Sequence, residues 1–208
     1  MFGFNLLEMV AGIPGLLMAL VIHEYAHALI ADKMGDNTPR MMGRLTLNPV
    51  AHIDPLGLIM LLIARFGWAK PVMINSSNFR NWRTGEICVS LAGPLANFIL
   101  AFAALALELV LYRLNVGTQG LILVLNLIVL YNINFGIFNL IPLPPLDGSH
   151  LLTVFLPYEW SYKLAQLERY TFLILIVLMA TPVFSYILVP LGRFIYGLFY
   201  VILQAIIL

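Results

Sequence analysis

The sequence predicts an all-α polytopic membrane protein with about five or six membrane segments and a small β hairpin or sheet at the cytoplasmic face. Three observations lead to this fold class: 62% of the 208 residues are hydrophobic, only 10% are charged, and the mean hydropathy is +0.95. Soluble domains typically have about 45–50% apolar and about 25% charged residues. A net charge of +1, without a basic patch, gives no indication of a nucleic-acid partner.

The long apolar runs come close to the roughly 20 residues that cross the hydrocarbon core of a bilayer. They are residues 4–31, 86–111, 121–141, 170–189 and 191–208. The first is too long for a signal-peptide h-region and no Lys or Arg precedes it, so we expect a retained membrane helix. A shorter run at residues 56–66 is interpreted as a re-entrant or interfacial piece, with a short span as the alternative.

Basic residues gather between the first two long runs. Seven of the eleven Lys and Arg residues lie in residues 32–85. The positive-inside rule therefore places this stretch in the cytoplasm and the N-terminus outside. Arg113 then falls outside, and Arg193 falls in a tight outer turn between the last two spans. We expect an integral, multi-pass protein of a prokaryotic cell membrane.

Two segments of the cytoplasmic stretch have the character of short strands. Residues 44–47 and 71–75 are β-branched or alternate in polarity, and Gly, Pro and Asn-Ser-Ser-Asn turn residues bound them. They predict the small hairpin or sheet at the membrane surface. No repeat or linker divides the chain, so we expect one membrane-embedded domain over residues 1–208.

The first span carries an H-E-x-x-H motif, formed by His23, Glu24 and His27. Residues four apart on a helix share one face, so the two imidazoles can chelate one metal ion while Glu24 reaches a water beside it. Ionisable side chains are costly inside a lipid-spanning helix, by at least about 2.5 kcal/mol for a charged group at its centre, and usually mark a functional site. The alternative is a polar cluster that only packs helices.

A hydrolytic zinc site needs a third protein ligand. Cys88 is the only cysteine, so a thiolate site is excluded and the ligand is a His, Asp or Glu. Asp147 closes a proline-rich segment that cannot be an unbroken helix, and irregular backbone at membrane depth lines a cavity or a polar site. We therefore expect Asp147 to complete a site for one Zn²⁺ per chain. The alternative is that Asp147 caps the helix that begins near Ser149.

These motifs resemble the site-2 protease family of intramembrane zinc metalloproteases. Four segments carry the likeness, residues 23–27, 48–57, 92–97 and 139–148. The resemblance implies that His23, His27 and Asp147 are the zinc ligands. It also implies that Glu24 is the general base. Neither a PDZ nor a CBS domain is recognisable, so we expect a minimal family member, with a catalytic core over about residues 1–157 and extra membrane helices over about residues 170–208.

The resemblance also implies positions that contact the substrate. Asn139 matches the Asn of the family's substrate loop, and Asn97 and His52 match recurrent family positions. Gly148, together with the proline loop, is expected to hold the substrate near zinc. For Asn97 the alternative is a helix-packing amide, and for His52 an ordinary loop histidine. His150 is either a donor to the site or a water-facing residue at a helix start.

The predicted function is hydrolysis of peptide bonds in or near the transmembrane segment of membrane-protein substrates, at an active site that opens toward the cytoplasm. The expected partners are a locally unwound transmembrane helix, which could add to a sheet edge, and the lipid bilayer. Two alternatives are a non-enzymatic zinc transporter and an inactive homologue that binds transmembrane helices. The single compact ligand set weighs against the first, and the intact Glu24 weighs against the second.

Overall fold

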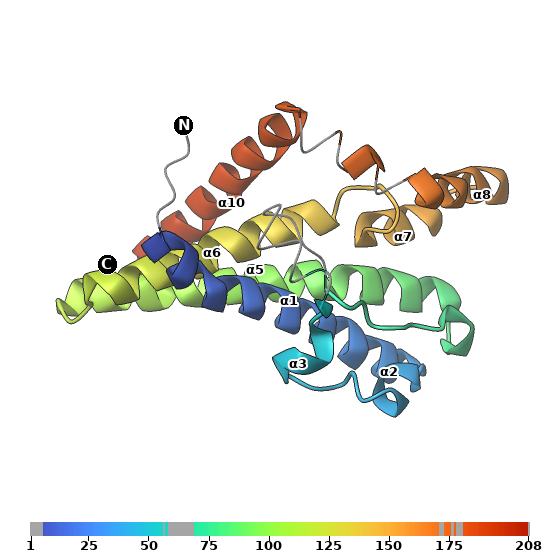
Figure 1. The fold of residues 1–208 in the computed structure, drawn as a ribbon, viewed down its shortest axis with the longest axis horizontal. Helices are drawn as coiled ribbons and strands as arrows, with labels where there is room; N and C mark the ends of the chain where they lie inside the picture. Colours follow the sequence, from blue (N-terminus) through green and yellow to red (C-terminus); the bar gives the residue numbers. More distant parts are fainter. Residues whose placement is uncertain are drawn as a thin grey trace.

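The computed structural model describes residues 6–55, 57, 69–170, 173–175, 177 and 181–207 (Figure 1). Its long helices are α1 (Leu6–Met34), α5 (Trp82–Leu114), α6 (Gln119–Asn139) and α10 (Val183–Ile207). Its short helices are α2 (Thr38–Met41), α3 (Pro49–His52), η1 (Ser76–Asn78), α7 (Asp147–Thr153), α8 (Tyr158–Leu167) and η2 (Glu168–Tyr170). The predicted helical membrane class is confirmed for this part of the chain.

Four of the described helices are long and apolar enough to cross a membrane. They are Leu7–Met34, Trp82–Leu114, Gln119–Asn139 and Tyr186–Ile207. The first three agree with the predicted spans to within a few residues at each end. The predicted re-entrant run at residues 56–66 lies outside the described residues, apart from Gly57.

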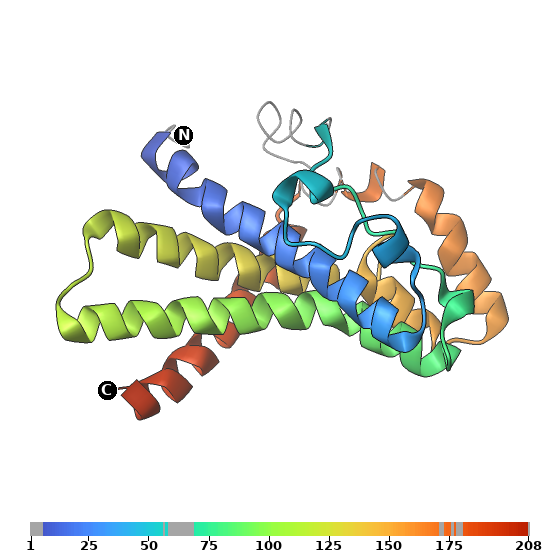
Figure 2. The same cartoon turned by 90° about the horizontal axis from the view of Figure 1, so that it is seen from below.

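Helices α1, α5 and α6 form the central bundle, in which α5 and α6 run antiparallel (Figure 2). Asn115, in the left-handed conformation (φ 53°), ends α5, and the Thr118 side chain caps α6. Between helices in lipid, close packing of small residues replaces the hydrophobic effect as the main attraction. Gly12 and Gly15 of α1 accordingly lie against Tyr131 and the adjacent backbone of α6.

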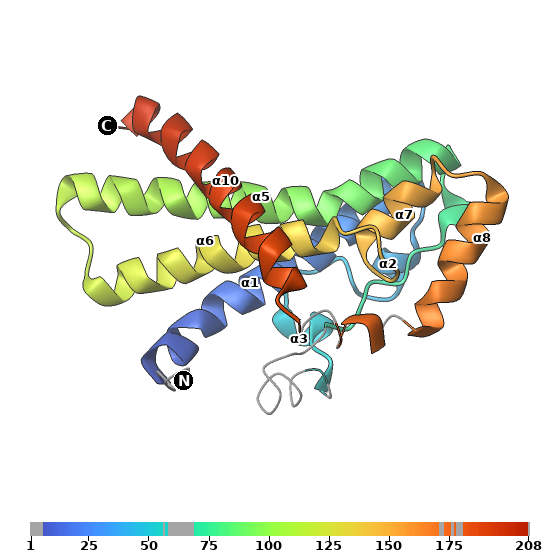
Figure 3. The ribbon, with the colours of Figure 1, turned by 90° about the horizontal axis from the view of Figure 1, so that it is seen from above.

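The predicted turn around Arg193 is wrong, because α10 is continuous from Val183 to Ile207 and passes through Pro190. A proline removes one helical hydrogen bond, but a turn within the hydrocarbon would leave several backbone groups unpaired, which costs more. Residues 191–208 are therefore not an independent span. The C-terminal end of α10 lies at the same end of the molecule as the α5–α6 connection and the start of α1 (Figure 3).

The predicted hairpin is also wrong for the residues that the structure describes. Residues 44–47 and 71–75 are irregular, and an isolated antiparallel bridge joins Ile53 to Ala69 nearby. The physical reason is that the Val72 and Asn75 N–H groups donate hydrogen bonds to the carboxylates of Glu24 and Asp36. These N–H groups are therefore not available to a partner strand.

Asp36 organises the loop that follows α1. It is fully buried, and its carboxylate accepts hydrogen bonds from Thr38, from the Asn75 N–H and from the Asn78 amide at 2.6–3.1 Å. Burial alone would raise the pKa of this carboxyl, but these hydrogen bonds lower the pKa below its ordinary value. The ionised Asp36 thus fastens the segment that ends at η1 to the C-terminal end of α1.

Candidate metal centre

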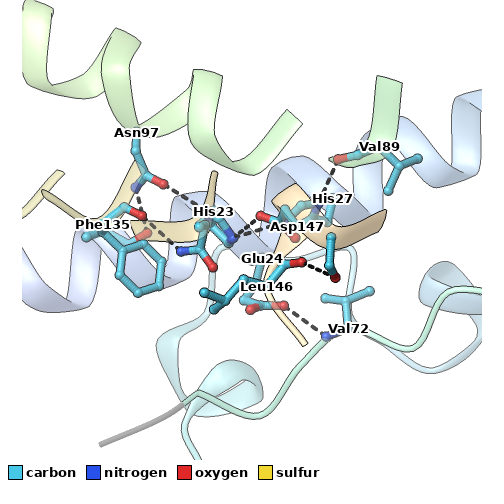
Figure 4. Close-up of polar contacts among 12 residues, drawn as sticks. His23, Glu24, His27, Val72, Val89, Asn97, Phe135, Leu146 and Asp147 are labelled. Atoms are coloured by element: carbon cyan, nitrogen blue, oxygen red, sulfur yellow. Dashed lines mark hydrogen bonds and ion pairs between the residues drawn. The ribbon is translucent and has the colours of Figure 1, made fainter. Parts of the chain in front are cut away.

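Three predicted site residues meet where α7 approaches α1 (Figure 4). His23 and His27 lie one turn apart on α1, and Asp147 is the first residue of α7. The Asp147 Oδ2 atom lies 3.1 Å from His23 Nε2 and 3.2 Å from His27 Nε2, and the two Nε2 atoms are 2.9 Å apart. Both histidines are almost fully buried, at 3% and 6% exposed.

The outer ring nitrogens determine the tautomer of each histidine. His27 Nδ1 lies 2.8 Å from the Val89 carbonyl oxygen, which can only accept, so Nδ1 carries the proton. His23 Nδ1 lies 2.8 Å from Asn97 Oδ1, and the Asn97 amide nitrogen is occupied elsewhere. His23 Nδ1 is therefore also the donor. In the neutral imidazoles, each Nε2 atom then presents a lone pair toward Asp147.

The three ligating atoms fit a metal ion. Asp147 Oδ2 is buried and receives no hydrogen bond, so two nitrogen lone pairs and a carboxylate oxygen face one another. Such acceptors repel unless a cation or a proton lies between them. Ligand atoms of a tetrahedral zinc site with bonds of 2.0–2.1 Å lie about 3.3 Å apart, slightly farther than these. Two imidazoles and one carboxylate also form a ligand set that suits zinc.

The turn between α6 and α7 positions Asp147 next to α1. Gly148 lies against the backbone of Leu140 and Ile141, and a Cβ atom there would come within 2.6 Å of the Ile141 carbonyl oxygen. Gly148 therefore allows the chain to fold back tightly before α7 begins. Leu146 is the N-cap residue, so the interpretation of Asp147 as a helix cap is wrong. A substrate contact of Gly148 stays a prediction.

Glu24 is not one of the three residues whose atoms converge. Its Oε2 atom accepts a 2.8 Å hydrogen bond from the Val72 N–H, in the irregular segment that was expected to be a strand (Figure 4). Val72 itself is buried, whereas Met73 is 56% exposed. The carboxylate of Glu24 is thus held at a fixed place next to the histidine pair without belonging to it.

Asn97 of α5 joins three helices at the back of the site. It is fully buried, and its amide nitrogen donates to the Ala19 carbonyl and to Asn132 Oδ1, both at 2.9 Å. Asn132 of α6 is also fully buried and donates to the Ile128 carbonyl. These bonds support the helix-packing alternative and add contact with His23. A substrate contact of Asn97 stays a prediction.

Gly93 of α5, within the segment 92–97 that carries the family resemblance, also belongs to the site. A Cβ atom on Gly93 would lie 2.5–2.6 Å from two ring atoms of His23 and closer still to His27 Nε2. The backbone of α5 therefore presses directly against both imidazoles. Because the approach spans 66 to 70 positions of the sequence, no local pattern shows it.

The remaining predicted site residues lie outside the three-residue group. Asn139 is buried at the end of α6, and its amide donates to the Phe135 carbonyl. His52 is buried at the end of α3, where Nε2 lies 2.8 Å from the Thr46 carbonyl oxygen. His150 is exposed on α7. The substrate contacts of Asn139 and His52 stay predictions.

Comparison with known proteins then identifies the family. Residues 109–182 match peptidase family M50. YwhC of Bacillus subtilis is 40% identical over 180 residues, which span 84% of this chain and 82% of YwhC. The chain belongs to peptidase family M50, the site-2 proteases. Rip2 of Mycolicibacterium smegmatis shares 35% identity with this site-2 protease, over 82% of the chain and 66% of Rip2.

A more distant relative, MJ0392 of Methanocaldococcus jannaschii, is 26% identical over 71% of the chain and 34% of its own length. All three relatives carry the words zinc metalloprotease in their names. No solved structure matches. As a site-2 protease, the chain is a metalloprotease, and its apolar helices indicate an integral membrane protein.

Proposed function

We propose that residues 1–208 form a single intramembrane metalloprotease domain that binds one zinc ion and cuts membrane proteins in or near their transmembrane segments. The observation that carries this proposal is the convergence of His23 Nε2, His27 Nε2 and Asp147 Oδ2. Three acceptor atoms facing one another are unfavourable unless a cation or a proton lies between them. The pair of histidines lies within an apolar helix that is long enough to cross a membrane, which supports a reaction at membrane depth.

His23, His27 and Asp147 would hold zinc, which when bound supplies Lewis-acid chemistry: it acidifies water and polarises a peptide carbonyl. Glu24 is the general base. Its carboxylate takes the proton from the attacking water and returns it to the leaving amine. The Val72 N–H keeps that carboxylate beside the histidine pair during both transfers.

The substrate is an unwound stretch of a transmembrane helix, because helical carbonyls are hydrogen-bonded and shielded. Residues 69–75 are extended or irregular beside Glu24, and Met73 is exposed while Val72 is buried. An extended substrate lying along this segment would present successive carbonyls to the site. The proposed substrate contacts at the edges of the site are Asn139, His52 and Gly148.

The metal centre opens toward the cytoplasm of a prokaryotic cell in this proposal. Most of the described basic residues lie between the last turn of α1 and the first turn of α5. They are Lys33, Arg40, Arg44, Lys70, Arg80 and Arg83. The positive-inside rule places this stretch in the cytoplasm. The start of α1 and the end of α10 then lie outside.

Asp147→Asn is expected to lower zinc affinity strongly. Substitution of a residue that hydrogen-bonds to a metal ligand typically lowers affinity by roughly 10- to 100-fold, and loss of a ligand should lower it further. The measurement is the zinc-to-protein ratio of the purified full chain after dialysis against buffered zinc, with cleavage of a membrane reporter in parallel. Asp32→Asn is the matched control, since Asp32 pairs with Arg40 at the end of α1. Wild-type zinc content in the Asp147 variant would contradict the proposal. So would zinc flux into liposomes that needs His23 but not Glu24.

Asn97 is proposed to position His23, because it accepts from Nδ1–H and so leaves Nε2 free for the metal. Asn97→Ala is expected to weaken zinc binding by about 10- to 100-fold. Asn97→Asp, which retains an acceptor for the imidazole, is expected to keep most of that affinity. If Asn97 only packed helices, both variants would lower thermal stability and would have the same zinc affinity.

A further inference from the structure

Arg193 is the only charged residue of α10, and it lies far from both ends of that helix. With a rise of 1.5 Å per residue, it is about 15 Å from the Val183 end and about 21 Å from the Ile207 end. Its side chain is exposed in the isolated chain. A cation at this depth is costly in lipid, and such residues normally pair with another group or face a polar cavity.

No partner for Arg193 is present among the residues that the structure describes. None of them forms a salt bridge or a hydrogen bond with its guanidinium. Glu108 of α5 accepts a hydrogen bond from Asn126 instead.

Arg193 lines a groove between α6 and α10 with a volume of about 440 Å³. Three further polar side chains line it, Asn126 and Asn134 from α6 and Tyr196 from α10, and its remaining walls are mainly aliphatic. Helix α10 crosses α6 obliquely (Figure 3), and Gly192 of α10 faces the Asn134 side chain of α6. The α6–α10 groove thus combines one cation, amide and phenol hydrogen-bonding groups, and apolar walls.

The groove lies behind the metal centre rather than in it. Phe135, the neighbour of Asn134, packs edge-on against the His23 ring with the centroids 4.9 Å apart. Asn132, two positions before Asn134, belongs to the buried network that reaches His23 through Asn97. One face of α6 therefore supports the histidines while another lines the groove, and the thickness of α6 separates the two.

We propose that the α6–α10 groove is an exosite for a transmembrane segment that carries an Asp or Glu side chain near its middle. The carboxylate would pair with Arg193, Asn134 would bind a nearby polar group, and the aliphatic walls would take the segment's apolar side chains. A lipid phosphate fits less well, because headgroups lie at the interface and Arg193 does not. This inference rests on the proposed function, since the segment would be that of a substrate.

The test is a binding measurement that requires neither zinc nor cleavage. The full chain, as the Glu24→Gln variant, is placed in phosphatidylcholine nanodiscs at pH 8. Fluorescent Leu/Ala transmembrane peptides with Glu, Leu or Lys at the central position are then titrated by energy transfer. The Glu peptide is expected to bind at least about tenfold more tightly than the Leu peptide. Arg193→Leu should remove this preference, Arg193→Lys should retain part of it, and Arg193→Glu should shift it to the Lys peptide.

The matched control is Arg113→Leu, which removes an exposed arginine at the end of α5 and should leave the preference intact. Equal binding of the Glu and Leu peptides would overturn the exosite. Loss of the preference for the Glu peptide when phosphatidylglycerol replaces phosphatidylcholine would assign the groove to lipid instead. A change of oligomeric state in Arg193→Leu without a peptide effect would assign it to a second copy. Because binding is measured without hydrolysis, these results leave the protease proposal independently testable.

Discussion

Replacing Glu24 by Gln is expected to lower peptide-bond cleavage by about 10²- to 10⁴-fold, the contribution typical of general acid–base catalysis, while the zinc content stays unchanged. A glutamine amide cannot take the proton of the attacking water. It can still accept the hydrogen bond that the Val72 N–H now gives to Glu24, so the local backbone has no reason to move. The three atoms that converge on the metal position come from other residues.

The measurement is cleavage of a transmembrane reporter by the purified protein, together with the zinc-to-protein ratio of the same sample. Glu159→Gln on α8 is the matched control, because it removes a carboxylate at an exposed position away from α1. Undiminished cleavage by pure Glu24→Gln would assign the base to another group. Loss of zinc from that variant would instead make Glu24 part of the ligand set.

Gly93→Ala is expected to empty the metal centre without altering any ligand. The added methyl group would lie 2.5–2.6 Å from ring atoms of His23 and would meet His27 Nε2 as well. Its neighbours are the rings of two buried, hydrogen-bonded histidines, so relief requires α5 to move or the rings to rotate. Overpacking of this kind costs about 1–3 kcal/mol of stability. Rotation of either ring would turn its Nε2 lone pair away from Asp147.

Zinc affinity, measured by competition with a chelating dye, should therefore fall more than tenfold in Gly93→Ala, and reporter cleavage should fall with it. Gly120→Ala in α6 is the matched control, since a Cβ atom there meets nothing within 4 Å. That exchange should preserve zinc binding. A Gly93→Ala protein with wild-type zinc affinity would show that α5 does not constrain the imidazoles as the structure has it.

The central helices could be predicted well from the sequence because length and polarity decide them. The predicted spans at residues 86–111 and 121–141 became Trp82–Leu114 and Gln119–Asn139. The grouping of the two histidines with Asp147 could also be predicted, since a pair four residues apart needs a third ligand and a proline-broken segment supplied an isolated acid. Each of these inferences used a local signal: the length and polarity of a run, a spacing of four residues, or prolines next to an acid.

The peripheral elements were predicted less well, and each error has a specific cause. Residues 71–75 look like a strand, but Glu24 and Asp36 accept hydrogen bonds from their backbone. The region around Pro190 and Gly192 looks like a turn, yet an apolar helix in lipid retains such residues because breaking it exposes more backbone. The groups that decided the outcome are remote in sequence from the segments that they affect.

The sequence by itself determined that this chain is a helical membrane protein of the site-2 protease family and which side chains are candidates to hold zinc. Composition, helical periodicity and a short motif carry that information locally. Only the tertiary structure decided that Asn97 contacts His23, that Gly93 lets α5 touch both imidazoles, and that Arg193 lines a groove between α6 and α10. These facts depend on how closely separate helices approach, and that distance is set by packing among residues scattered along the whole chain.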